Sequence, residues 1–407
     1  MPEKPKRVAV IGGGPAGMMV ALFALREGAR VTLLERNEKL GKKLYITGKG
    51  RCNVTNASDI SDFFPSIPRN PEFLYSALYT YSNVQLMDWL RERGLKLKTE
   101  RGQRVFPLSD KSSDVIGVFR RELERLGVTI EYETQVQGIR HTGGQITGLV
   151  TSRGLKTADH YILAAGGGSY PLTGSDGGIL GMLKGLGIKT QPFTPSLIPL
   201  TVKEPEVVQL AGVSLKNVTF TLLEGKRVLY QELGEMLFTH DGVSGPLVLS
   251  ASCLRTQGSM HCEIDLKPGL TEEMLDARIL RDFAKYQNKD LANGLSDLLI
   301  GRLIPLILER AKIPPDTKVH SVTKQQRRAL LESIKHLTFT VKGTRPLAEA
   351  IISRGGVDVS EVDPSTMKLI RYSNGSVCGE LIDVDAFTGG YNLQIAFSTG
   401  HLAGVSL

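Results

Sequence analysis

The sequence has few cysteines, four in 407 residues, and they are far apart. None of them forms a C-x-x-C pair, which excludes a dithiol relay and argues against a disulfide framework. Such usage is typical of a reducing compartment, so we expect a cytoplasmic protein. The cysteines are Cys52, Cys253, Cys262 and Cys378.

The sequence also lacks a long uninterrupted apolar run. The stretch from Val8 to Leu25 follows three basic residues and so resembles a signal peptide. Glycines and Pro15 interrupt it, however, and no small-residue cleavage site follows. No other stretch is apolar enough to span a membrane. We therefore expect neither secretion nor a membrane span.

Positive charge exceeds negative charge, with 50 Lys and Arg against 42 Asp and Glu. The excess is uneven, because residues 271–345 hold 14 Lys and Arg against 9 Asp and Glu. Anionic cofactors account for part of such a bias, and a polyanionic partner remains an alternative. No metal site is expected.

The chain opens with a βαβ pattern. Arg7–Ile11 and Arg30–Glu35 are typical of buried strands, and Pro15–Glu27 is typical of a helix between them. Further along, the pattern predicts helices over 71–93, 112–126, 271–286, 302–311 and 322–336. It predicts strands over 128–133, 136–140, 145–152, 160–164, 218–223, 227–231 and 337–342.

Prolines and short strand-like runs begin near residue 192, and glycine-rich sequence returns from Ala348. We interpret this as one α/β nucleotide-binding domain, 1–191 and 347–407, interrupted by an insert of mixed β and α character, 192–346. The parallel sheet of such a domain needs helical crossovers, which the flanking segments supply.

Gly12 to Gly17 form a G-x-G-x-x-G between the first strand and the first helix. In this motif Gly12 permits the tight turn, Gly14 lets the backbone approach a diphosphate, and Gly17 lets helix and strand pack closely. The diphosphate lies at the helix N-terminus, and Glu35 at the end of the second strand suits a ribose diol. The motif predicts a dinucleotide site without choosing between NAD and FAD.

Three more segments favour a cofactor site. The loop Leu40–Asn53 is rich in glycine and carries four cations, so it could cradle phosphates and a ring edge, although a solvated basic loop is the alternative. The apolar strand Ile162–Gly168 ends in small residues that bring a second backbone close. Asp383 suits ribityl or ribose hydroxyls, and the helix start at Gly389–Asn392 could direct N–H groups at a ring.

With these motifs the chain resembles the HI0933-like flavoprotein family. The stretches that carry the resemblance are VAVIGGGPAGMMVA at 8–21, GKKLYITGKGRCNVTN at 41–56, RVFP at 104–107, LAAGGGSYPLTGSDG at 163–177, FTHDGVSGPLVLSAS at 238–252, SRGGVDVSEVDPSTM at 353–367 and GELIDVDAFTGGYNLQIAFSTG at 379–400.

The resemblance implies a discontinuous, GR2-type Rossmann-like FAD-binding domain. It also implies that the insert combines a β-barrel, about 192–268 and 337–346, with a helical part, about 269–336. Finally, it implies FAD contacts at Gly12, Gly14, Pro15, Ala16, Gly17, Glu35, Arg36, Lys43, Gly48, Arg51, Cys52, Asn53, Val136, Ala165, Gly166, Gly167, Asp383, Gly390, Tyr391 and Asn392.

No catalytic residue is evident from the sequence. Cys52 is a weak candidate, because Arg51 and Lys49 beside it could stabilise a thiolate, whereas a packed thiol is the simpler interpretation. Tyr170, Arg104 and His240 are polar candidates for proton donation and are more often structural.

Three functions remain open. The first is a dehydrogenase or reductase acting on a C–C or C=C bond of a small molecule next to a carbonyl, with NAD(P)H as a transient donor. The second is reduction of uridine in ribosomal RNA, motivated by the basic bias and by Lys324, Arg327 and Arg328. The third is a flavin-binding sensor without turnover. The family resemblance includes links to both enone reduction and ribosomal RNA uridine reduction.

Overall fold

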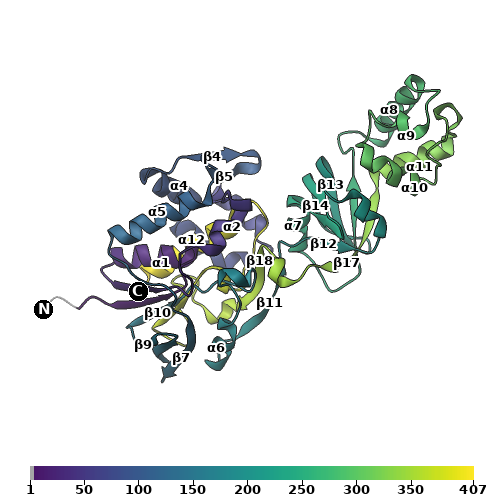
Figure 1. Ribbon diagram of the computed structural model, residues 1–407. Helices are drawn as coiled ribbons and strands as arrows, with labels where there is room; N and C mark the ends of the chain where they lie inside the picture. Colours follow the sequence, from purple (N-terminus) through teal and green to yellow (C-terminus); the bar gives the residue numbers. More distant parts are fainter. Residues whose placement is uncertain (1–3) are drawn as a thin grey trace. The chain divides into compact units, whose positions relative to one another are not determined.

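The computed structural model describes residues 4–407 and divides into two compact units (Figure 1). The first unit joins the chain up to Ser196 with Pro346–Leu407, and the second is Leu197–Arg345. The first unit is therefore discontinuous, with the second inserted into it, as the sequence predicts.

A five-stranded parallel sheet forms the centre of the first unit, in the order β19-β10-β1-β2-β6. Helices connect β1 to β2 and β2 to β6, as crossovers between parallel strands require, whereas antiparallel strands connect β6 to β10. The strands are β1 (Arg7–Ile11), β2 (Arg30–Leu34), β6 (Thr129–Glu131), β10 (His160–Leu163) and β19 (Gly375–Val377).

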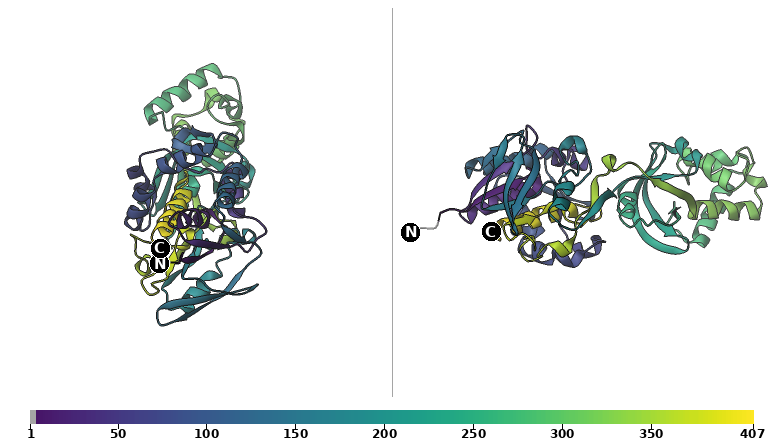
Figure 2. Two further views of the ribbon diagram at one scale, coloured as in Figure 1. Left: turned by 90° about the vertical axis from the view of Figure 1, so that its left-hand side faces the viewer. Right: turned by 90° about the horizontal axis from the view of Figure 1, so that it is seen from below.

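Helix α1 (Pro15–Arg26) packs on the sheet, and α5 (Ser112–Arg125) and α12 (Tyr391–Val405) pack against α1. Residues 16–24 of α1 are all buried, because the sheet and α12 enclose the helix. The first and last long helices of the chain are thus neighbours, as the purple and yellow ribbons show (Figure 2). This contact closes the core of the unit.

Three smaller sheets complete the first unit, and all are antiparallel. They are β3 (Thr55–Asn56) with β5 (Arg104–Pro107) and β4 (Leu97–Glu100); β7 (Val136–Thr142) with β8 (Gln145–Thr151) and β9 (Gly154–Lys156); and β11 (Thr190–Ser196) with β18 (Ile352–Val357).

The remaining helices of this unit are short: α2 (Lys42–Ile46), α3 (Tyr75–Thr80), α4 (Asn83–Glu92) and α6 (Ile179–Gly185). The prediction of one helix over 71–93 is wrong. A 3-10 turn and α3 end before Tyr81, and α4 starts after Ser82. Ser82 and Gln85 form a capping box that begins the new helix.

The second unit is a closed barrel with a helical part. The barrel order is β12 (Leu200–Val202), β15 (Gly242–Ser244), β14 (Arg227–Phe238), β13 (Ser214–Glu224), β16 (Met260–Asp265) and β17 (Leu337–Thr344). The helices are α7 (Pro246–Ser252), α8 (Glu272–Lys285), α9 (Leu291–Gly294), α10 (Ile304–Arg310) and α11 (Lys324–Lys335).

The predicted start of the insert at residue 192 needs correction. The backbone of 190–196 pairs with β18 and so belongs to the first unit, and the second unit begins at Leu197. Its end at Arg345 lies one residue before the predicted limit of 346. The sequence missed the strand at 190–196 because two prolines interrupt it.

Candidate cofactor site

The glycine turn has the geometry that its sequence predicts. Gly12 has a φ of +100°, and a Cβ there would lie 2.5 Å from the carbonyl oxygen of Ala164. A Cβ on Gly17 would lie 1.8 Å from the carbonyl oxygen of Gly12. A Cβ on Gly14, in contrast, would meet nothing within 4 Å. The turn is therefore closely packed on its inner side and open at Gly14.

Helix α1 begins directly at this opening. Gly14 is the N-cap and Pro15 is the first helical residue, so no side chain satisfies the free N–H groups of the first turn. Ala16 is buried, 2.8 Å from the position of a Cβ on Gly379. The open face at Gly14 and the helix N-terminus together suit an anionic group.

Glu35 lies beneath the glycine turn and is 6% exposed. Its Oε2 accepts a hydrogen bond from the backbone N–H of Gly13 at 2.8 Å. Its Oε1 accepts from the backbone and the amide of Asn37 at 2.8 and 2.7 Å. Burial raises the pKa of Glu35, and these N–H groups oppose the shift. The carboxylate is thus fixed in place, and its contact with a ribose stays a prediction.

Lys43 lies within a polar cluster that joins four segments. Its Nζ is 2.6 Å from Ser169 Oγ and 2.6 Å from Glu380 Oε2. Glu380 Oε1 also accepts from the backbone N–H of Ser353 at 2.9 Å. A Cβ on Gly167 would lie 1.9 Å from Ser353 Oγ, so the close approach of this strand end requires glycine. Glu380 and Ser353 were not among the predicted site residues.

Two other predicted cofactor cations have carboxylate partners within the protein. Arg51 forms ion pairs with Glu100 and with Asp110, and its guanidinium lies 4.2 Å from the centroid of the Phe106 ring. Arg36 pairs with Asp176 at 2.6 Å. These two arginines link loops of the site to each other, a role that the residue composition of the loops did not indicate.

Cys52 does not fit the role of a stabilised thiolate. The side chain is fully buried, and this burial raises the pKa of the thiol to about 12. The neighbouring Arg51 is occupied by two carboxylates, so its charge is compensated. Burial and the compensated charge of Arg51 favour the packed thiol, and a catalytic role of Cys52 stays a prediction.

Gly48 and Asn53 lie close together in the loop that also contains Cys52. Gly48 adopts a left-handed conformation, and a Cβ there would lie 3.3 Å from the backbone nitrogen of Asn53. Asn53 Oδ1 is buried and has no hydrogen-bond partner among residues 4–407. Buried acceptors are rarely left unpaired, so this oxygen indicates a missing donor.

The C-terminal segment approaches β3 through a second glycine turn. A Cβ on Gly390 would lie 2.4 Å from the carbonyl of Thr55, and α12 begins at Tyr391, as predicted. The side chain of Asn392 is used locally, because its amide exchanges hydrogen bonds with the backbone of Ala386. Asp383 Oδ1 accepts from Gly355 N–H, and burial raises the pKa of Asp383.

The other predicted contacts are backbone positions. Val136 is buried and is the first residue of β7, next to an irregularity in its pairing with β8. Ala165 and Gly166 follow β10, and Gly166 has a φ of +74°. Their contacts with a cofactor stay predictions.

The three polar candidates for proton donation lie in different places. Tyr170 follows the glycine-rich end of β10 with a φ of +53°, and burial raises its pKa. Arg104 opens β5 of the first unit. His240 belongs to the second unit, in the turn between β14 and β15. The structure assigns none of them a proton-transfer role.

The residues of the first unit fit FAD. The open face at Gly14 leaves room for a diphosphate, whereas a side chain would fill it. The unpaired oxygen of Asn53 offers an acceptor to a polar ring, and the turn at Gly389–Gly390 brings the start of α12 to the same loop. The fit thus rests on an open backbone and an unsatisfied polar atom.

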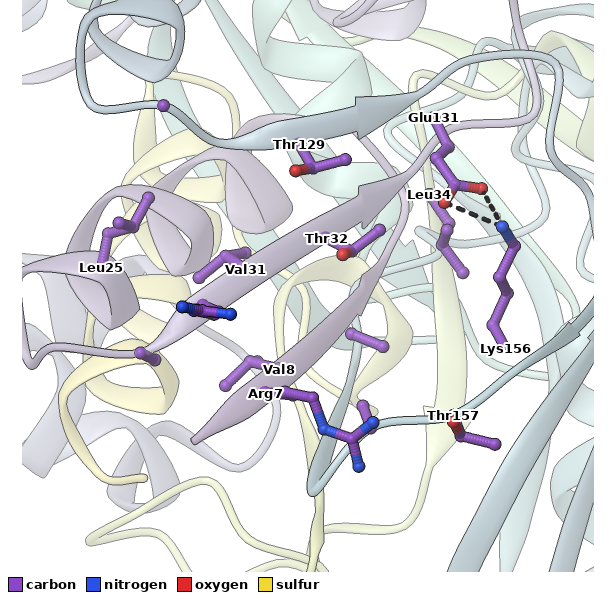
Figure 3. A pocket seen from close by; sticks show the side chains of 15 residues that line it. Arg7, Val8, Leu25, Val31, Thr32, Leu34, Thr129, Glu131, Lys156 and Thr157 are labelled. Carbon is purple, nitrogen blue, oxygen red and sulfur yellow. Dashed lines mark hydrogen bonds and ion pairs between the residues drawn. The ribbon is translucent and has the colours of Figure 1, made fainter. Parts of the chain in front are cut away.

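A separate pocket of about 450 Å³ lies beside β1, β2 and β6 (Figure 3). It is lined by Arg7 and Arg30 at the start of their strands and by the ion pair of Lys156 with Glu131. None of the predicted cofactor residues lines it. Ligands of open parallel sheets bind beyond the carboxyl ends of the strands, so this pocket is not the cofactor site.

Two negative findings concern residues 4–407. Within this part of the chain, no group of His, Cys, Asp and Glu side chains could hold a metal ion. None of the helices there combines the length and the apolar character that crossing a bilayer requires.

The chain matches one protein family over nearly its whole length. The profile of the HI0933-like protein Rossmann domain matches residues 6–406. The chain belongs to this family. The HI0933-like chain accordingly has a Rossmann-like FAD-binding fold and is an FAD-dependent oxidoreductase.

Curated relatives match this HI0933-like protein over nearly its whole length. A 3-dehydro-bile acid delta(4,6)-reductase of Clostridium scindens is 32% identical, with 98% of each chain covered. Ribosomal RNA dihydrouridine synthases of Haemophilus influenzae and Escherichia coli are 30% and 28% identical. They cover 98% and 96% of this chain, and this chain covers 97% and 95% of theirs.

Solved structures agree in fold. A 3-ketosteroid delta1-dehydrogenase of Sterolibacterium denitrificans superposes with a TM-score of 0.53 at 12% identity, with 99% of each chain covered. A quinol-fumarate reductase superposes with a TM-score of 0.52 at 14% identity, covering 99% of this chain and 71% of its own. At such low identity these likenesses show the fold of the HI0933-like protein alone.

Proposed function

We propose that this HI0933-like protein reduces a C=C bond conjugated with a carbonyl group, with NAD(P)H as a transient electron donor. The observation that carries the proposal is that relatives with different named substrates perform reactions of this one kind. The relatives are named for a 3-dehydro-bile acid and for dihydrouridine in ribosomal RNA. The double bond of uracil, like that of an enone, is conjugated with a carbonyl group. The reaction type is therefore better supported than either substrate.

Bound FAD would supply hydride chemistry, and the protein would supply binding and orientation. The N–H groups of the first turn of α1 would hold the diphosphate at the open face of Gly14. Glu35 is fixed by Gly13 and Asn37 and offers its remaining lone pairs to a ribose. Asn53 Oδ1 would orient the ring by accepting a hydrogen bond.

The polar cluster of Lys43 joins the N-terminal and C-terminal parts of the site. Glu380 pairs with Lys43 and is 21% exposed in its side chain, while the lysine is 18% exposed. Because the pair joins α2 to the segment after β19, it keeps the N-terminal and C-terminal parts of the site in register. Lys43 thus acts as a positioning residue.

The donor docks transiently in this proposal. The sequence has no second G-x-G-x-x-G between a strand and a helix, so it offers no dedicated NAD(P)H domain. In this proposal the donor and the substrate would use one site in turn.

A small-molecule enone is the first candidate substrate, and a uridine of ribosomal RNA is the second. The second is favoured by exposed cations of α11: Lys324 has no carboxylate partner within residues 4–407, and Arg328 is 81% exposed with Glu332 only at 4.0 Å. Arg327 is a weaker candidate than its sequence position indicates, because its Nε is bound by Asp276 at 2.7 Å.

Anaerobic reduction of the purified holoprotein tests the donor. We expect NADH or NADPH to bleach the flavin absorbance without substrate, and a conjugated enone to restore it. If neither nicotinamide nor chemical donors of matched potential reduce the flavin, the proposed turnover is contradicted. The protein would then be interpreted as a flavin-binding sensor.

The substrate is tested on cells with and without the gene. Nucleosides from their ribosomal RNA are compared by mass for a uridine two mass units heavier, a difference that follows from the addition of one hydrogen molecule. Loss of that nucleoside on deletion, and its return with the wild-type gene, supports the RNA substrate. An unchanged nucleoside profile assigns the activity to a small molecule.

A further inference from the structure

Two loops of the first unit meet at the glycine turn that begins α12. The amide of Asn56, which is 1% exposed, donates to the carbonyl oxygens of Gly102 at 3.0 Å and of Gly389 at 3.1 Å. The turn of residues 101–103 is therefore bound to the turn of residues 389–390. Since α12 starts there, the two turns flank the expected ring end of the cofactor.

The loop that carries Lys49 reaches the same place. A Cβ on Gly48 would lie 3.7 Å from the ring of Phe106, whose other neighbours include the guanidinium of Arg104 at 5.9 Å from the ring centroid. Strand β3 pairs with β5, which places Asn56 opposite Arg104. Lys49, which follows Gly48, and Arg104, the first residue of β5, thus belong to two segments that lie beside one aromatic ring. We call these two residues the cationic rim.

The backbone of both loops is strained. Lys49 has a φ of +57°, and Gln103, next to Arg104, also has a φ of +57°. A left-handed conformation at a residue with a side chain costs about 1 kcal/mol or more. Such strain persists where surrounding contacts fix the backbone, so the two cations are presented by preorganised loops.

The cationic rim has no carboxylate partner, unlike the cations beside it. Arg51 is bound by Glu100 and Asp110, and Lys98 by Asp110 at 2.6 Å. Within residues 4–407, no carboxylate lies within ion-pair distance of Lys49 or Arg104. Arg104 donates its Nε to the backbone of Arg101 and leaves its terminal nitrogens available.

We propose that the cationic rim binds an oxyanion of the substrate, a carboxylate or a phosphate, while the conjugated bond lies at the cofactor. The proposal rests on the proposed function and names its substrate class: an unsaturated carbonyl compound with an anionic group. Charge-assisted hydrogen bonds from lysine and arginine are the interactions that oxyanions prefer. A steroid carboxylate and an RNA phosphate offer the same chemistry.

The test uses holoprotein variants Lys49→Gln and Arg104→Gln, with Lys184→Gln as the control. Lys184 is an exposed lysine of α6 that forms no ion pair with any other residue of the described range 4–407. FAD content and the flavin spectrum of all three should match those of the wild type. The probes are a 3-oxo-Δ4 steroid carboxylic acid, its methyl ester, and a single-stranded RNA that contains uridine, with binding followed by the flavin absorbance.

For a carboxylate source, each rim variant weakens binding of the acid about tenfold, as expected for one charged hydrogen bond, and leaves the ester unchanged. For a phosphate source, each variant weakens RNA binding and lowers the salt dependence by about one counterion. Lys184→Gln changes neither. Equal binding of both probes by wild type and rim variants, or no binding of either by the wild type, overturns the proposal.

These measurements are independent of turnover. A protein that binds the acid through the rim but never reduces it contradicts the proposed function and leaves the oxyanion site standing. A protein that reduces acid and ester with the same KM, unaffected by either substitution, keeps the proposed function and removes the oxyanion site.

Discussion

The glycine turn at residues 12–17 and the basic loop at residues 41–53 use opposite means to form one site. The turn acts through its backbone, and each glycine has a separate geometric reason. The loop acts through side chains, yet Lys43 and Arg51 are held by carboxylates of the protein. Backbone geometry is therefore set by local sequence, whereas the charge of a loop is set by partners distant in sequence.

The substitution Gly17→Ala disrupts the packing of the glycine turn and has the largest expected effect. The new Cβ would lie 1.8 Å from the backbone oxygen of Gly12, which has no flexible end to move. We expect a loss of more than about 4 kcal/mol in the free energy of unfolding, or no folded protein. Urea unfolding measures it, and a variant with the wild-type midpoint would contradict the packing described here.

Gly14→Ala separates folding from binding in the same turn. The φ of Gly14 is −78°, and a Cβ there meets nothing, so the unfolding midpoint of the apoprotein should match the wild type. The methyl group would occupy the space of the diphosphate and cost about 1–3 kcal/mol, or roughly tenfold to hundredfold in the Kd of FAD. Titration of apoprotein with FAD measures it. Unchanged affinity would mean that the diphosphate lies elsewhere.

Acid titration of the basic loop has the smallest expected effect. Arg51 lowers the pKa of Glu100, and Lys98 with Arg51 lowers that of Asp110. Both carboxyl groups have a lower pKa in the folded protein than in the unfolded chain. Their contribution to folding stability is therefore complete at a pH above the unfolded-state pKa values, and it is lost as the pH falls through the folded-state pKa values.

The double variant Glu100→Gln Asp110→Asn checks this window. Its thermal midpoint should be below that of the wild type at neutral pH, and the difference should shrink below about pH 4. A difference independent of pH would show that packing of the Phe106 ring, and not charge, holds the loop.

The sequence predicts the ends of elements where a local signal exists. The three glycines, Pro15 and the acidic end of β2 lie within a single βαβ unit, so spacing alone predicts their arrangement. The break between α3 and α4 also has a local signal, the capping box of Ser82 and Gln85, which the amphipathic pattern of 71–93 obscured.

Other features depend on contacts between distant residues. Glu380 reaches Lys43 across 337 positions, and Arg51 reaches Glu100 and Asp110 across 49 and 59. No spacing rule links such residues, so a cation in a glycine-rich loop could equally have faced a phosphate. The burial that raises the pKa of Cys52 likewise arises only from the folded core.

The pairing of the first and last long helices has a consequence for biosynthesis. Helix α1 leaves the ribosome before the inserted unit, while β19 and α12, which complete its sheet and cover it, are made after the entire inserted unit. The glycine turn therefore spends most of translation on an unfinished core with exposed apolar surface. Long-range contacts of this kind slow folding, so we expect the inserted unit to fold first and the first unit to close only after α12 has left the ribosome.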